Sequence, residues 1–159
     1  MYPQRKSPRL AGYDYAQAGA YFVTLCTQGR ACLFGEVVGG AMRLSAAGRI
    51  AHAEMALIPT HWGGAVDVDL FVVMPNHVHA IIVLVGTRLG ASASKPCEPD
   101  TQKRVPTLGS VVNGYKGGVT RVIHATQPDI ALPVWQSRYH DHILRDEPDL
   151  DRIRAYIAD

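Results

Sequence analysis

The stretch AVDVDLFVVMPNHVHAIIVLV, residues 65–85, decides the fold. It first alternates acidic with apolar residues, then becomes wholly apolar, and after Pro75-Asn76 a second apolar run begins at His77. Two such runs joined by a tight turn predict a β-hairpin with strands over residues 65–73 and 77–85. The sequence therefore indicates a sheet, with two histidines just past a turn and near a sheet end.

His77 and His79 flank a single valine in the second strand of this hairpin. Successive side chains of a strand point to opposite faces, so the two imidazoles share one face while Val78 points the other way. Neutral imidazole is a common ligand of divalent metals, and the pair predicts a metal site that needs a third ligand. The alternative is a pair of hydrogen-bonded or exposed histidines that bind no metal.

The composition is that of one globular domain over residues 1–159, with 47% hydrophobic and 19% charged residues. A formal charge of +2 is too small to indicate a nucleic-acid partner, so any basic surface has to be local. Three cysteines without paired zinc spacing argue against a disulfide framework or a zinc ribbon. With no signal peptide and no membrane span in the pattern, we expect a cytoplasmic protein without a membrane partner.

The rest of the chain contains further strand and helix patterns, together with two segments that show neither. Residues 1–19 are basic and turn-rich and are expected to form an arm, and residues 86–106 a flexible connection. Strands are predicted over residues 20–27, 33–38, 42–44 and 134–144, and helices over residues 46–58, 107–122 and 149–157. Pro59 is expected to stop the first helix.

Tyr115 lies among Gly114, Gly117 and Gly118 in the second helix. Each glycine in a helix interior costs about 0.5–1 kcal/mol relative to alanine. Three within five residues imply that something moves or approaches closely there, or that the helix is shorter. A tyrosine hydroxyl can attack a phosphodiester when a metal polarises the phosphate, giving a phosphotyrosine link that allows rejoining without ATP. The alternative for Tyr115 is a half-buried packing residue.

Several ordered motifs give the chain a resemblance to a known family. They are Gly12-Tyr13-Asp14-Tyr15 with Gly19-Ala20-Tyr21-Phe22-Val23-Thr24, Cys32-Leu33-Phe34-Gly35-Glu36, Val73-Met74-Pro75-Asn76-His77-Val78-His79, Gly114-Tyr115-Lys116 with Thr120-Arg121, and Trp135-Gln136-Ser137-Arg138-Tyr139-His140-Asp141-His142 with Arg145-Asp146-Glu147. Over nearly its whole length the chain resembles the REP-associated tyrosine transposases, within the His-hydrophobic-His group of single-strand transposases.

The resemblance implies a single α+β domain with an antiparallel sheet and packed helices in a ferredoxin-like (RRM-like) arrangement. It implies a metal-dependent DNA endonuclease and strand transferase that cuts single-stranded DNA next to hairpin-forming palindromic repeats. Tyr115 would be the nucleophile, and His77 and His79 would be ligands of magnesium or manganese. The partner would be single-stranded or hairpin DNA, the protein a monomer or homodimer associated with the nucleoid.

The sequence departs from the resembling proteins at two places. In the insertion-sequence branch a polar residue one helical turn after the tyrosine completes the metal site, but here that position is Val119, which cannot ligate. The third ligand is then expected from His142, with His140 as the alternative, since both share a strand face opposite Asp141. The resembling proteins also usually continue past Tyr156-Ile157 with Asn-Pro and a tryptophan, where this sequence ends at Asp159.

DNA contacts are expected from cationic side chains, which would make binding salt-dependent. The candidates are Arg5, Lys6 and Arg9 of the arm, Lys116 and Arg121 near the tyrosine, and Arg138 and Arg145 in the last segment. A flexible basic arm can enter a groove of the hairpin.

Two other functions compete with this hypothesis. One is a non-catalytic hairpin-binding protein that keeps the fold. The other is a metal-dependent hydrolase of a small phosphoester, with His77, His79 and Asp69 as ligands.

Overall fold

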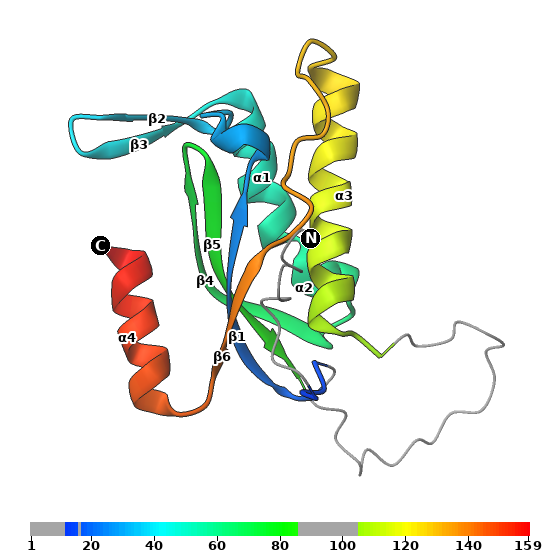
Figure 1. Ribbon diagram of the computed structural model, residues 1–159, viewed down its shortest axis with the longest axis vertical. Coiled ribbons are helices and arrows are strands. Elements are labelled where there is room, and N and C mark those ends of the chain that lie inside the picture. The colour runs from blue at the N-terminus through cyan, green and yellow to red at the C-terminus, as the bar shows by residue number, and fades with distance from the viewer. Residues whose placement is uncertain (1–11, 16, 86–104) are drawn as a thin grey trace, which may run out of the picture.

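The structure, a computed structural model, describes residues 12–15, 17–85 and 105–159 (Figure 1). Four strands form an antiparallel sheet in the order β4-β5-β1-β6, and a separate hairpin is made of β2 and β3. The strands are β1 (Gly19–Cys26), β2 (Gly35–Val38), β3 (Ala41–Leu44), β4 (Val66–Met74), β5 (His77–Leu84) and β6 (His140–Leu144). The helices are α1 (Ala46–Ala56), α2 (Ile58–His61), α3 (Leu108–Thr126) and α4 (Glu147–Ala158).

The strand order confirms the predicted fold class. Along the chain, the four strands of the main sheet and the two helices that cover one of its faces follow one another as β1, α1, β4, β5, α3 and β6. This is the β-α-β-β-α-β order of a ferredoxin-like domain. The predicted hairpin is formed by β4 and β5, with Met74 opposite His77 across the Pro75-Asn76 turn. The histidine pair therefore lies at the turn end of a central strand, as the sequence predicts.

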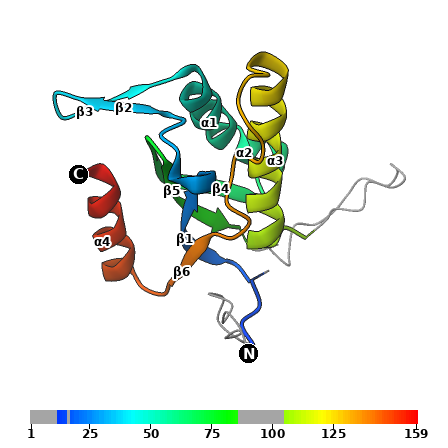
Figure 2. The same cartoon turned by 45° about the horizontal axis from the view of Figure 1, so that its top comes forward.

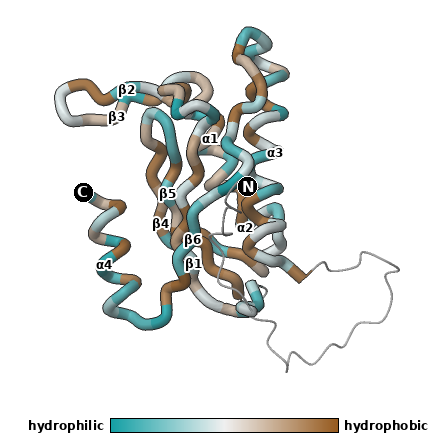
Figure 3. Tube along the Cα trace, in the orientation of Figure 1, coloured by the Kyte–Doolittle hydropathy of each residue, from teal (hydrophilic) through white to brown (hydrophobic). Residues whose placement is uncertain are grey.

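The sheet is covered on its two faces by different helices. Figures 1 and 2 show α1 and α3 on one side of the sheet and α4 on the other. Residues of β1 alternate between the two sides: Tyr21 and Val23 belong to the main core with α1 and α3, and Phe22 belongs to a small cluster under α4. Figure 3 shows hydrophobic residues along β4 and β5 and mixed colours along α4, consistent with a helix that buries only one side.

Several predicted boundaries differ from the structure. The strand predicted over residues 134–144 begins only at His140, and before it a single bridge joins Trp135 to Thr27. The first helix ends at Ala56, and Pro59 stands in the first turn of α2, where a missing backbone N–H costs nothing. The final helix begins at Glu147 because the Asp146 side chain accepts a hydrogen bond from the backbone N–H of Asp149.

Helix α3 runs unbroken through its three glycines and is longer than predicted. A capping box between Thr107 and Ser110 fixes its first turn, and a buried apolar stripe packs it on the sheet. A Cβ at Gly118 would lie 2.7 Å from a carboxylate oxygen of Glu54 on α1, whereas Gly117 faces open space. Tertiary packing therefore outweighs the low helix propensity of glycine here.

Most of the predicted arm and of the predicted connection, residues 1–11 and 86–104, lies outside the described residues. Among the residues that are described, no helix is long and apolar enough to cross a bilayer.

Candidate active site

His77 and His79 lie side by side on the α4 face of the sheet. Their ring centroids are 4.5 Å apart, and in the β1–β5 register they stand opposite Cys26 and Thr24. The ring of His79 also stacks on Phe22, which belongs to the cluster under α4. The shared face predicted from the spacing of two is thus present.

Each imidazole is oriented by one hydrogen bond to its Nδ1. Asn76 Oδ1 accepts a hydrogen bond from His77 Nδ1 over 2.7 Å, and His79 Nδ1 shares a hydrogen bond of 2.9 Å with the hydroxyl of Thr24. Within the described part of the chain neither Nε2 has a hydrogen-bond partner. The Asn76 oxygen can only accept, so it makes Nδ1 the protonated nitrogen of neutral His77 and leaves Nε2 as the nitrogen that can ligate. The Thr24 hydroxyl can donate or accept, so it orients the His79 ring without selecting its tautomer.

Both histidines are neutral near pH 7. Burial lowers the pKa of His79 to about 4, and the neighbouring His77 adds to this. The pKa of His77 is lowered by burial and then by the charge of Arg30. Neutral imidazoles can bind a metal without first losing a proton, so burial leaves both side chains in the protonation state that a metal ligand needs.

The described residues do not bring a third ligand to this pair. No group of three His, Cys, Asp or Glu side chains that could hold a metal occurs among them. His142, the predicted third ligand, shares the face but is exposed, and its Nε2 pairs with Asp149 of α4 over 2.9 Å. His140 stands opposite Thr24 on β6, so a whole strand separates it from His79.

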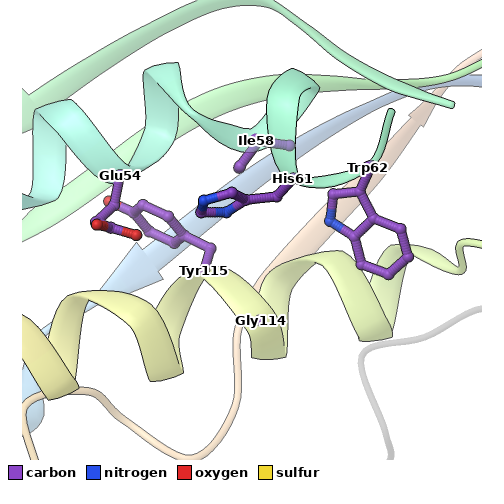
Figure 4. Close-up of a pocket in the computed structure, with 6 residues that line it drawn as sticks. All are labelled: Glu54, Ile58, His61, Trp62, Gly114 and Tyr115. Atoms are coloured by element: carbon purple, nitrogen blue, oxygen red, sulfur yellow. The ribbon is translucent and has the colours of Figure 1, made fainter. Parts of the chain in front are cut away.

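Tyr115, the predicted nucleophile, lies on the other side of the sheet. It is only 4% exposed, and its hydroxyl donates to the backbone oxygen of Ala51 in α1 over 2.9 Å. Figure 4 shows its ring directed from α3 toward Glu54, beside a pocket of about 240 Å³. Burial raises the pKa of the Tyr115 hydroxyl, and Glu54 raises it further. The structure does not bring Tyr115 to the histidine pair, and its environment is that of a core residue.

A different tyrosine does reach the pair. Tyr156 near the end of α4 is 60% exposed, and its ring centroid is 5.4 Å from that of His79 and 6.2 Å from that of Phe22. Sequence reasoning missed this residue. The available signal was the stripe of Ile153 and Ile157, which places Tyr156 at the border of the buried side of α4.

The predicted DNA-binding residues have three different settings. Arg5, Lys6 and Arg9 lie outside the described residues. Lys116 is half-buried, and its Nζ donates to the backbone oxygens of Gln136 and Arg138, so it organises the segment before β6. Arg121, Arg138 and Arg145 are exposed.

A shallow cleft of about 230 Å³ adjoins the histidine pair. Its walls include Thr24 and Cys26, which stand opposite the two histidines, together with Gln136, Arg138, Tyr139 and His140. Arg30, an exposed cation that the sequence analysis did not select, is close enough to His77 to lower the pKa of that imidazole. Two cationic side chains, Arg30 near His77 and Arg138 in the cleft, therefore lie in this region of the surface.

No protein-family model matches the chain. An uncharacterized protein of Haemophilus influenzae is 35% identical over 162 residues, which covers 96% of this chain and 86% of that protein.

Two solved structures are similar at 17% identity, which shows a transposase-like fold. One is a REP-associated tyrosine transposase bound to a REP hairpin, with a TM-score of 0.60, covering 94% of this chain and 69% of that one. The other is a protein from Deinococcus radiodurans assigned as a transposase, with a TM-score of 0.54, covering 94% and 95%.

Proposed function

We propose that this chain, which belongs to the same family as the uncharacterized Haemophilus influenzae protein, is a DNA strand endonuclease and transferase with Tyr156 as its nucleophile. The observation that carries the proposal is the position of the exposed Tyr156 ring, 5.4 Å from His79 and on the same face as the histidine pair. The substrate is single-stranded DNA next to a hairpin, which the REP hairpin bound by the structural neighbour supports.

The chemistry is a phosphoryl transfer from DNA to the tyrosine. Tyr156 Oη forms a bond to phosphorus, the phosphorus–oxygen bond to one part of the strand breaks, and the released oxygen takes up a proton. Because Tyr156 is exposed, its own proton can pass to solvent. The reverse attack, by a free strand hydroxyl on the phosphotyrosine, releases Tyr156 and rejoins DNA without ATP.

His77 and His79 would hold the metal through their Nε2 atoms. When bound there, magnesium or manganese would polarise the scissile phosphate and offset its charge. The chain itself contributes the neutral state of both imidazoles, their orientation by Asn76 and Thr24, and the placement of Tyr156. Arg30 and Arg138, which lie near the pair and in the neighbouring cleft, would contact phosphates next to the cut.

A pair of matched substitutions tests the nucleophile. Protein is mixed with manganese and a single strand carrying a hairpin, and a covalent protein–DNA species is sought on a denaturing gel. We expect the adduct in the wild type and in Tyr115→Phe, and none in Tyr156→Phe. An adduct that survives Tyr156→Phe and disappears in Tyr115→Phe would restore Tyr115 as nucleophile.

The second candidate function is hairpin binding without cleavage. It is favoured by the finding that no third metal ligand joins the pair in the described ranges. It predicts salt-sensitive binding and no adduct with any divalent metal. The small-phosphoester hydrolase loses its support, because both carboxylate oxygens of Asp69 accept hydrogen bonds from Arg154 and Asp69 does not group with the histidines.

A further inference from the structure

Helix α4, which carries Tyr156, is attached to the sheet by few contacts. Ile157 is its one buried side chain, and Leu150 and Ile153 are half-buried against the cluster of Phe22, Ile81 and Leu144. A narrow apolar stripe of this kind fixes which side of a helix faces the sheet. It resists a small roll of the helix about its own axis only weakly, because apolar contacts are non-directional.

The Arg154 side chain supplies a directional contact on one flank of this stripe. Its Nε donates to Asp69 Oδ2 over 2.8 Å and its Nη2 to Asp69 Oδ1 over 2.9 Å. This is a two-pronged guanidinium–carboxylate pair, whose planar geometry is more restrictive than a single hydrogen bond. Asp69 lies at a register shift in the edge strand β4, so the pair joins the helix to the side of the sheet.

Tyr156 lies on the opposite flank of the same stripe. Successive residues of a helix are rotated by about 100° about its axis. Arg154 comes one position after Ile153, and Tyr156 comes one position before Ile157. The two side chains therefore project to opposite sides of the apolar stripe that faces the sheet. A roll that moves Arg154 away from β4 therefore changes how the Tyr156 ring lies over His79.

We infer that the Arg154–Asp69 ion pair is a positioning device that sets the rotation of α4 and thereby holds Tyr156 against the histidine pair. The inference rests on the proposed function only for its catalytic consequence. Arg154 and Asp69 are positioning residues, since neither touches the reacting atoms. Exposed ion pairs contribute little to stability, so breaking this one is expected to leave the fold intact and to slow the chemical step about threefold to fivefold.

Asp151 provides a matched control on the same helix. Its carboxylate also accepts a hydrogen bond from Arg154, over 3.1 Å, but it lies on α4 itself and does not bridge to the sheet. Asp69→Asn and Asp151→Asn each remove one negative charge and one partner of Arg154. Both variants have the same net charge, and only the first releases the helix from β4.

The experiment measures the single-turnover rate of adduct formation at saturating hairpin DNA, together with the dissociation constant of the DNA. We expect Asp69→Asn to slow adduct formation about threefold to fivefold with an unchanged dissociation constant, and Asp151→Asn to match the wild type. Arg154→Lys, which keeps the charge but not the two-pronged geometry, should fall between them. The exchange Asp69→Arg with Arg154→Asp should recover most of the rate. Equal rates in Asp69→Asn and Asp151→Asn would overturn the inference. A higher dissociation constant for DNA in Arg154→Lys would also overturn it, by making Arg154 a DNA contact.

A second measurement separates this inference from the proposed function. Nuclear Overhauser effects between the rings of Tyr156 and His79 report the contact without any cleavage. We expect them to weaken in Asp69→Asn and to persist in Asp151→Asn. If the wild type forms no adduct, the proposed function fails while this comparison still decides the positioning role. Undiminished effects in Asp69→Asn would refute it.

Discussion

The two faces of the sheet contain the same kinds of side chain in opposite settings. On the α1 and α3 face, Tyr115 is almost fully buried and its hydroxyl is bonded to a backbone oxygen. On the α4 face, Tyr156 is exposed and its ring lies near that of His79, one of two neighbouring neutral histidines whose Nε2 atoms have no hydrogen-bond partner among the described residues. The chemistry open to a tyrosine in this fold therefore depends on the face of the sheet that it occupies, because one face forms the core and the other leaves polar groups accessible.

The largest expected effect tests the chemistry of the α4 face. His77→Ala should lower adduct formation by more than about 100-fold and leave hairpin binding largely intact, because even residues that only orient a metal ligand are worth about 10–100-fold. The assay is the denaturing gel with manganese, beside a direct binding measurement. His124→Ala, at an exposed position near the end of α3, is the control and should cleave normally. Unimpaired cleavage by His77→Ala would remove the metal site from the proposal.

The next largest effect compares the two tyrosines as packing residues. Tyr115→Ala should lower the free energy of unfolding by about 3–5 kcal/mol, since a buried aromatic ring leaves a cavity. Tyr156→Ala should lower it by less than about 1 kcal/mol, because the side chain is mostly exposed. Urea denaturation followed by circular dichroism measures both. A similar loss of unfolding free energy in both variants would contradict the view that Tyr115 is a core residue and Tyr156 a surface residue.

The hairpin and the shared face of the histidines could be predicted from the sequence because both depend on local rules. A turn at Pro75-Asn76 and a period of two fix the direction of His77 and His79 whatever the rest of the chain does. The partner tyrosine could not be predicted in this way. Which face each helix covers depends on the crossings of the chain over the sheet, and these put α3 and its Tyr115 opposite to α4 and its Tyr156.

The third ligand shows the same limit. The strand pattern predicts that His142 and His140 share a face opposite Asp141, and the register of β6 agrees, but neither histidine forms a metal-ligand group with His77 and His79 among the described residues. Its Nε2 pairs with Asp149, a residue of the helix that follows, and this contact depends on how α4 folds back over β6. The sequence pattern gives the direction of a side chain, whereas its neighbours come from tertiary packing.

A smaller effect should appear in the pH dependence of stability without metal. The unfolded chain protonates His79 near its ordinary pKa of about 6.5, whereas the folded chain keeps it neutral until about pH 4. Below pH 6.5 the unfolded state therefore binds the additional proton, and the free energy of unfolding should fall between pH 6.5 and 4. His79→Gln should reduce this loss, measured by urea denaturation in chelator at pH 7 and pH 4.5. An identical loss in the variant would show that other groups cause it.

The smallest effect separates two explanations of the glycines in α3. If they loosen the helix so that Tyr115 can move during cleavage, Gly117→Ala should slow adduct formation. In the structure Tyr115 is fixed in the core and a Cβ at Gly117 meets nothing within 4 Å, so alanine should fit without strain. We then expect Gly117→Ala to raise the free energy of unfolding by about 0.5–1 kcal/mol, through helix propensity, and to leave the cleavage rate unchanged. Thermal melting measures the stability, and the gel assay measures the cleavage rate of the same sample. A variant that is more stable but cleaves more slowly would show that motion of α3 contributes to catalysis.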